Sequence, residues 1–68
     1  MRTIEVKGYK QGDEFFMTVT RFDGSGKAIT TTDKAGVDSV SELNNVMNEY
    51  QRIMRHYGTR VVILKGDK

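Results

Sequence analysis

Apolar and polar residues alternate along the first part of the chain, which is typical of β-strands with one buried face. Residues 3–9, TIEVKGY, alternate around Ile4 and Val6, and residues 14–22, EFFMTVTRF, alternate around Met17. Successive strand side chains point to opposite faces of a sheet. Two strands with a common buried face are therefore predicted.

Residues 10–13, KQGD, predict a four-residue hairpin loop between these strands. This loop would place three pairs opposite one another on the buried face: Ile4 with Val19, Val6 with Met17, and Gly8 with Phe15, where the glycine leaves room for the ring. Phe16 then points to the opposite, outer face.

Residues 23–26, DGSG, predict a second turn, and residues 27–32, KAITTT, a third strand rich in β-branched threonine. The direction of Ile29 depends on the turn. A loop with an odd number of residues sends Ile29 to the core, and an even loop sends it to the outer face. We favour the odd loop, because Ile29 is the only large apolar side chain of this strand.

A helix is predicted over residues 39–58, SVSELNNVMNEYQRIMRHYG. Ser39 and Glu42 form the S-x-x-E pattern of a capping box, and Gly58 suits a left-handed C-cap. Apolar residues recur at three- and four-residue steps and give one broad stripe: Leu43, Val46, Met47, Tyr50, Ile53, Met54 and Tyr57.

Residues 60–66, RVVILKG, predict a last strand that is apolar on both faces, as in an interior strand or one whose second face is also covered. The element order is β-β-β-α-β. We expect one α+β domain over residues 1–68: a three-stranded antiparallel meander, a helix on one face, and a C-terminal strand parallel to the first, in the order 4-1-2-3.

The composition limits the stability that this chain can reach on its own. A core built from 68 residues offsets the entropy of chain ordering only narrowly, and no cysteine is present to add a disulfide. Burial against a second copy or a partner would help. Eleven basic and nine acidic residues leave a net charge of +2, too weak for the footprint of a strong nucleic-acid binder. Neither a signal peptide nor a transmembrane run is recognisable, which predicts a soluble cytoplasmic protein without membrane contact.

No catalytic constellation is recognisable, so we expect no enzyme and no cofactor. The lone His56 lies where a helix would end and lacks the further histidine or cysteine that a metal site needs. Asp13 and Glu14 flank a turn, and Ser25 is not followed by the helix of a nucleophile elbow. The glycine-rich DGSGK precedes a strand, whereas a phosphate-binding loop precedes a helix.

Two surfaces remain as candidates. The first is the outer sheet face, where exposed apolar side chains would mark contact with a protein partner or a second copy in a homodimer. Its residues are Tyr9, Phe16, Thr18, Thr20, Phe22, Val62 and Leu64. The second is a basic patch suited to an acidic protein or a nucleic-acid backbone. Its residues are Arg52, Arg55, Arg60 and Lys65.

Residues 14–50, from EFFMTVTRFDGSGKAITTT into the helix, resemble the arm-binding domains of phage-type integrases. That resemblance implies a three-stranded sheet backed by a helix, with the outer sheet face reading a DNA groove. The outward positions here are Phe16, Thr18, Thr20 and Phe22 in place of basic residues. Aromatic side chains at such positions would instead stack on single-stranded bases.

The architecture also resembles small phage-encoded proteins that block host machinery, including some anti-CRISPR proteins. The segments that carry the likeness are FFMTVTRFDGSGKAITTT, the helix, and VVILKGDK. This resemblance implies a non-enzymatic inhibitor that occludes the surface of a host protein. An antitoxin-like α/β domain would have a similar outline.

Overall fold

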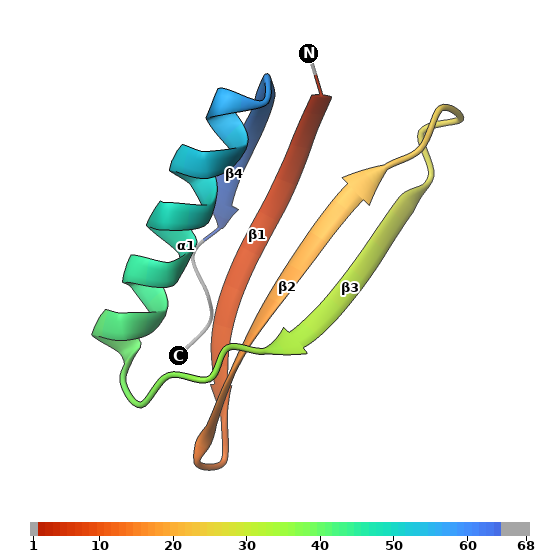
Figure 1. The fold of residues 1–68 in the computed structure, drawn as a ribbon. Coiled ribbons are helices and arrows are strands. Elements are labelled where there is room, and N and C mark those ends of the chain that lie inside the picture. Colours follow the sequence, from red (N-terminus) through yellow and green to blue (C-terminus); the bar gives the residue numbers. More distant parts are fainter. Residues whose placement is uncertain (1, 65–68) are drawn as a thin grey trace.

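A four-stranded sheet with one helix on one face makes up residues 2–64, which the computed structural model describes (Figure 1). The elements are β1 (Arg2–Gln11), β2 (Glu14–Phe22), β3 (Ala28–Lys34), α1 (Val40–His56) and β4 (Thr59–Leu64). The sheet order is β3-β2-β1-β4, with β1 antiparallel to β2 and parallel to β4. The predicted α+β fold and the strand order 4-1-2-3 are confirmed.

The hairpin between β1 and β2 is tighter than predicted. Gln11 lies opposite Glu14, so the connection is the two-residue turn Gly12–Asp13. Gly12 has φ +63°, a conformation that glycine adopts without steric cost. A two-residue loop with positive φ matches the twist of the flanking strands.

The predicted pairing of β1 with β2 is therefore wrong by two residues. Arg21 lies opposite Ile4, Val19 opposite Val6, and Met17 opposite Gly8. A shift of two residues leaves every side chain on its predicted face. Phe15 still points towards the helix, but it lies opposite Lys10, whose Nζ is 5.7 Å from the ring centroid.

The turn between β2 and β3 contains an odd number of residues. Phe22 lies opposite Ala28, and the Asp23 N–H donates to the Lys27 carbonyl (3.0 Å). Ile29 consequently lies opposite Arg21 on the helix side of the sheet, where it is half-buried. The preference for an odd loop is confirmed.

Both predicted helix caps are present. The Glu42 N–H donates to Ser39 Oγ (3.1 Å), and the Asp38 N–H donates to Glu42 Oε1 (3.1 Å). At the other end the Gly58 N–H donates to the Arg55 carbonyl, and Gly58 has φ +78°. These bonds satisfy backbone groups that a helix leaves unpaired at its ends.

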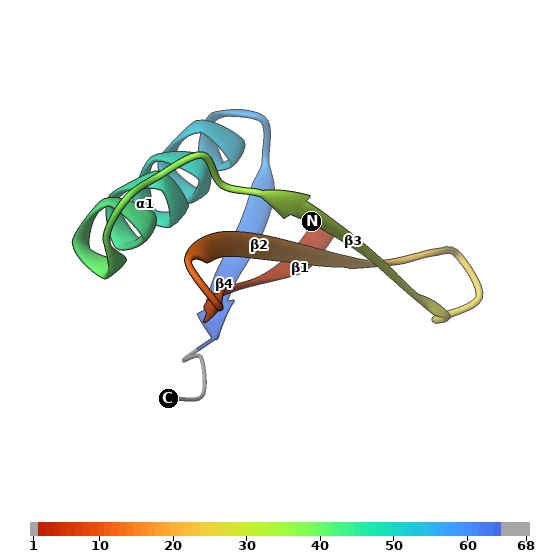
Figure 2. The same cartoon turned by 90° about the horizontal axis from the view of Figure 1, so that it is seen from below.

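The core lies between α1 and the β1–β4 half of the sheet. Its buried members are Ile4, Val6, Phe15, Leu43, Met47 and Val61. Met17, Val19 and Ile63 pack against them from the sheet. Figure 2 shows α1 on one side of the sheet, with the β2–β3 hairpin reaching away from it.

The side chains of Leu43 and Met47 from α1 pack directly over Gly8. A β-carbon on Gly8 would lie 2.8 Å from Leu43 Cδ2 and 3.1 Å from Met47 Cε. The room that we expected Gly8 to leave for Phe15 is occupied by these helix side chains instead.

Strand β4 lies at the edge of the sheet, which excludes an interior position for its apolar run. Val61 is buried beneath α1, whereas Leu64 is exposed on the other face. Residues 65 and 66 of the predicted strand lie outside the described residues.

Replacing Phe15 with alanine is expected to unfold the protein. The ring is buried in the core, and such a truncation costs about 3–5 kcal/mol, most of the stability of a marginal domain. Circular dichroism in a urea titration measures the loss. Phe16→Ala, which removes the same atoms from the outer face, serves as the matched control and should retain a cooperative transition. Equal destabilisation by both changes would show that the outer face is a second core.

Candidate functional site

The outer face of the sheet carries all seven residues predicted for it. The register puts even-numbered positions of β2, β3 and β4 and odd-numbered positions of β1 on the side away from α1. Phe22 and Leu64 are 44% and 39% exposed, and the other five are half-buried. The seven are Tyr9, Phe16, Thr18, Thr20, Phe22, Val62 and Leu64.

An aromatic pair occupies one end of this face. Tyr9 lies opposite Phe16, with ring centroids 5.4 Å apart and planes inclined by 20°. On the other flank, Phe16 lies opposite Lys34, which forms an ion pair with Glu14. The four-residue loop predicted from the sequence would place Lys7 opposite Phe16, so the sequence did not reveal the pairing of the two rings. Only the shorter hairpin loop brings the two rings together.

Threonines fill the centre of the face, and three of them have partners for their hydroxyl groups. Thr18 Oγ1 donates to the Lys7 carbonyl (3.0 Å), and the hydroxyls of Thr20 and Thr30 hydrogen-bond to one another (2.9 Å). The donors of Thr18 and of one threonine of the Thr20–Thr30 pair are therefore already used, and the other hydroxyl of that pair needs an acceptor when a partner excludes water from the face.

Two charged residues divide the apolar part of the face. Glu5 lies between Val62 of β4 and Thr20 of β2, and Lys7 lies between Leu64 and Thr18 in the same way. The apolar side chains of β4 are thereby separated from those of β2. The face combines small apolar areas with fixed charges of both signs.

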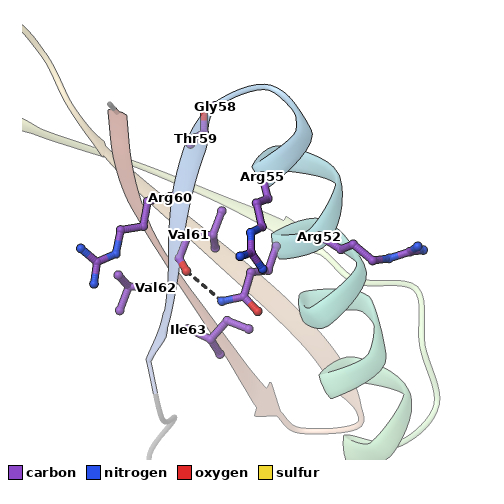
Figure 3. A pocket seen from close by; sticks show the side chains of 9 residues that line it. Arg52, Arg55, Gly58, Thr59, Arg60, Val61, Val62 and Ile63 are labelled. Carbon is purple, nitrogen blue, oxygen red and sulfur yellow. Dashed lines mark hydrogen bonds between the residues drawn. The ribbon is translucent and has the colours of Figure 1, made fainter.

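The predicted basic residues line a hollow of about 830 Å³ between α1 and β4, but their side chains do not converge. Figure 3 shows Arg60 and Arg52 pointing to opposite sides, with Arg55 between them. Arg52 forms an ion pair with Glu49, and the hydrogen bond between them raises the pKa of the Arg52 guanidinium above its usual value. Lys65 lies outside the described residues.

The side chain of Gln51 reaches from α1 to β4 at this hollow. Its Nε2 donates to the Val61 carbonyl (2.9 Å), so a helix side chain occupies a backbone acceptor of edge strand β4 (Figure 3). This contact could not be predicted from the sequence, because Gln51 is an ordinary polar residue beside the apolar stripe.

Part of the helical stripe lies outside the core. Ile53 is 49% and Tyr57 78% exposed. With Val46, Tyr50 and Met17, Ile53 borders a shallow second hollow of about 380 Å³ beside β2. The helical pattern did not reveal the exposure of Ile53 and Tyr57. It shows which residues share a stripe but not how much of that stripe packs against the sheet.

The residues considered for catalysis have ordinary surroundings. His56 is exposed in the last turn of α1, Asp13 lies in the first hairpin turn, and Ser25 hydrogen-bonds to Asp23. Among residues 2–64, no three side chains of the metal-binding types gather at one point. The same segment contains no helix with the length and apolar character needed to cross a membrane.

Comparison with protein-family models, with curated proteins and with solved structures gave no match to this chain.

Asp23 organises the turn between β2 and β3. Its Oδ1 accepts hydrogen bonds from Ser25 Oγ (2.7 Å), the Ser25 N–H (2.9 Å) and the Lys27 N–H (2.9 Å). These bonds, the one from the Ser25 hydroxyl foremost, hold the pKa of the Asp23 carboxyl below its usual 3.8.

Asp23→Asn is expected to lower the melting temperature at neutral pH, and by progressively less as the pH falls below 3.8. The lowered pKa means that the carboxylate stabilises the fold above the unfolded value of 3.8, and that this contribution is lost as the pH falls through the folded value. Melting curves at several pH values measure the difference. Asp13→Asn in the other turn is the control, and an identical pH profile for both variants would contradict the role of Asp23.

Proposed function

We propose that this chain is a small non-enzymatic protein-binding module whose outer sheet face covers, and so blocks, a surface of a partner protein. The observation that carries the proposal is the stacked Tyr9–Phe16 pair on the face away from α1. The resemblance to phage-encoded inhibitors, anti-CRISPR proteins among them, suggests that the partner is a host protein in the cytoplasm.

The ring pair has the properties of a binding anchor. Aromatic side chains dominate the energetics of many protein interfaces, and an anchor costs less entropy when its rotamers are already restricted. Tyr9 and Phe16 restrict one another by stacking, and each is half-buried before a partner arrives. Contact with an apolar surface would remove the rest of their area from water.

The remainder of the face supports specificity. The Thr18 hydroxyl already donates within the sheet, and the Thr20–Thr30 pair leaves one hydroxyl whose O–H can donate to a partner. Glu5 and Lys7 add one charge of each sign beside the apolar groups. Charges at such positions reject partners that place a like charge opposite them.

Nucleic-acid binding, the function implied by the likeness to integrase arm-binding domains, has less support. The outward positions of β2 are aromatic or threonine, and the three arginines near β4 point in different directions. A gel-shift assay at low salt separates the two functions. A salt-sensitive shift that requires Arg55 and Arg60 would favour nucleic acid over a protein partner.

Phe16→Ala is expected to weaken binding to the partner about 30-fold while leaving the protein folded. Truncation of an aromatic anchor costs roughly 2 kcal/mol, which corresponds to that factor. Capture from a host lysate identifies a partner, and titration of the purified partner by calorimetry measures the affinity. Tyr9→Ala should act in the same direction.

The control is Asn48→Ala, which changes an exposed residue of α1. It should bind as the unchanged protein does. Equal affinities for Phe16→Ala, Tyr9→Ala and Asn48→Ala would contradict the proposed use of the outer face.

A further inference from the structure

The two edge strands of the sheet differ in how they are protected. Along β4, helix α1 packs against the strand, and the Gln51 side chain occupies the Val61 carbonyl. Strand β3 has no neighbour on its far side within residues 2–64, and α1 does not contact it. An uncovered edge is a template for another strand.

The hydrogen bonds at the two ends of β3 identify its free backbone groups. The Ala35 N–H donates to the Phe15 carbonyl (2.9 Å), and the Asp23 N–H donates to the Lys27 carbonyl (3.0 Å). In an antiparallel pair, hydrogen-bonded positions alternate with positions whose groups point away. Odd-numbered residues of β3 therefore bond to β2. The N–H and C=O groups that point outward belong to Ala28, Thr30, Thr32 and Lys34.

The sequence of this edge is complementary to itself. Lys27 precedes the strand, Asp33 lies near its end, and the residues between them are uncharged. Both charged residues are exposed, and Asp33 lies on the helix side of the sheet; Lys27, whose carbonyl accepts from the Asp23 N–H, continues the alternation of the strand and would share that side. Turning a second copy by 180° about Thr30 would place Lys27 of each copy opposite Asp33 of the other.

We propose that β3 pairs antiparallel with β3 of a second copy of this chain, with Thr30 on the two-fold axis, to form a dimer with one continuous sheet. The outward-pointing groups of Thr30 meet their equivalents, and Ala28 meets Thr32 of the second copy. Ile29 lies opposite Thr31, a β-branched pair that suits a strand. Two ion pairs between Lys27 and Asp33 hold the register.

A neighbouring register with Thr31 on the axis uses the same backbone groups but fits the side chains less well. It would place Ile29 opposite Asp33 and Lys27 opposite Ala35, which separates the opposite charges. The charge pattern therefore selects Thr30 as the axis.

The dimer would carry two outer faces on the same side of one sheet. A partner with two copies of its own site could then be bound at both, which raises the overall affinity without a new contact. The pairing uses the edge of β3 and not the outer face, so the proposed dimer does not depend on the proposed function.

Charge reversal tests the proposal. Lys27→Glu and Asp33→Lys each replace two attractive pairs by two repulsive ones, which should raise the dissociation constant of the dimer about tenfold. The double change Lys27→Glu with Asp33→Lys should restore it. A mixture of the two single variants should form a mixed dimer more readily than either variant dimerises alone. Analytical ultracentrifugation over a concentration series measures all four samples.

Two outcomes would overturn the proposal. One is an unchanged protein that remains monomeric at millimolar concentration. The other is a dimer that neither single reversal weakens. Circular dichroism establishes that each variant is folded, and Phe16→Ala, which alters the outer face only, should dimerise normally.

Single cysteines locate the axis, because the chain has none of its own. Opposed hydrogen-bonded residues of antiparallel strands lie about 5.5 Å apart at Cα, within the range of a disulfide. Thr30→Cys should therefore cross-link under mild oxidation, and Thr31→Cys should not. Cross-linking of Thr31→Cys alone would overturn the register, and cross-linking of neither would overturn the pairing.

Discussion

Helix α1 packs over strand β1 at Gly8, where a β-carbon would lie 2.8 Å from Leu43 Cδ2 and the leucine side chain would have to shift. This close approach brings Leu43 and Met47 down onto Val6, the most deeply buried side chain of the core. Because β1 lies beside β4, the helix that packs on Gly8 also covers Val61 of β4. The missing β-carbon of Gly8 thus leaves room for Leu43 and Met47 between the helix and the sheet.

The position of α1 over β1 and β4 also explains which parts of the sheet remain uncovered. Helix α1 lies over the β1–β4 half and does not reach β3, so β3 has a backbone ladder with β2 but no contact with the helix (Figures 1 and 2). Ile53 and Tyr57 stay exposed at the flank of α1 for the same reason. Within residues 2–64, the aromatic face is open because α1 covers the opposite side of the sheet, and the edge of β3 is bare because α1 does not extend over it.

Local chemistry explains which features could be predicted from the sequence. The helix ends follow from Ser39 and Gly58, whose capping bonds involve only near neighbours. The register of the first hairpin could not be obtained in this way, because a strand pattern with a period of two residues is unchanged by a shift of two. The turn Gly12–Asp13 decides it, and with it the contact between Tyr9 and Phe16. The directions of Arg52, Arg55 and Arg60 depend on packing between α1 and β4, which a local sequence pattern does not predict.

The parallel pairing of β1 with β4 joins opposite ends of the chain, with Ile4 beside Val61. Pairings between distant segments form slowly, because the loop between them must close before any contact is gained. During synthesis β1, β2 and β3 are complete well before Thr59–Leu64 leaves the ribosome. Until then β1 is itself an open edge and the core lacks Val61. Folding of residues 2–64 is therefore expected to finish with the docking of β4, the last of these strands to be synthesised.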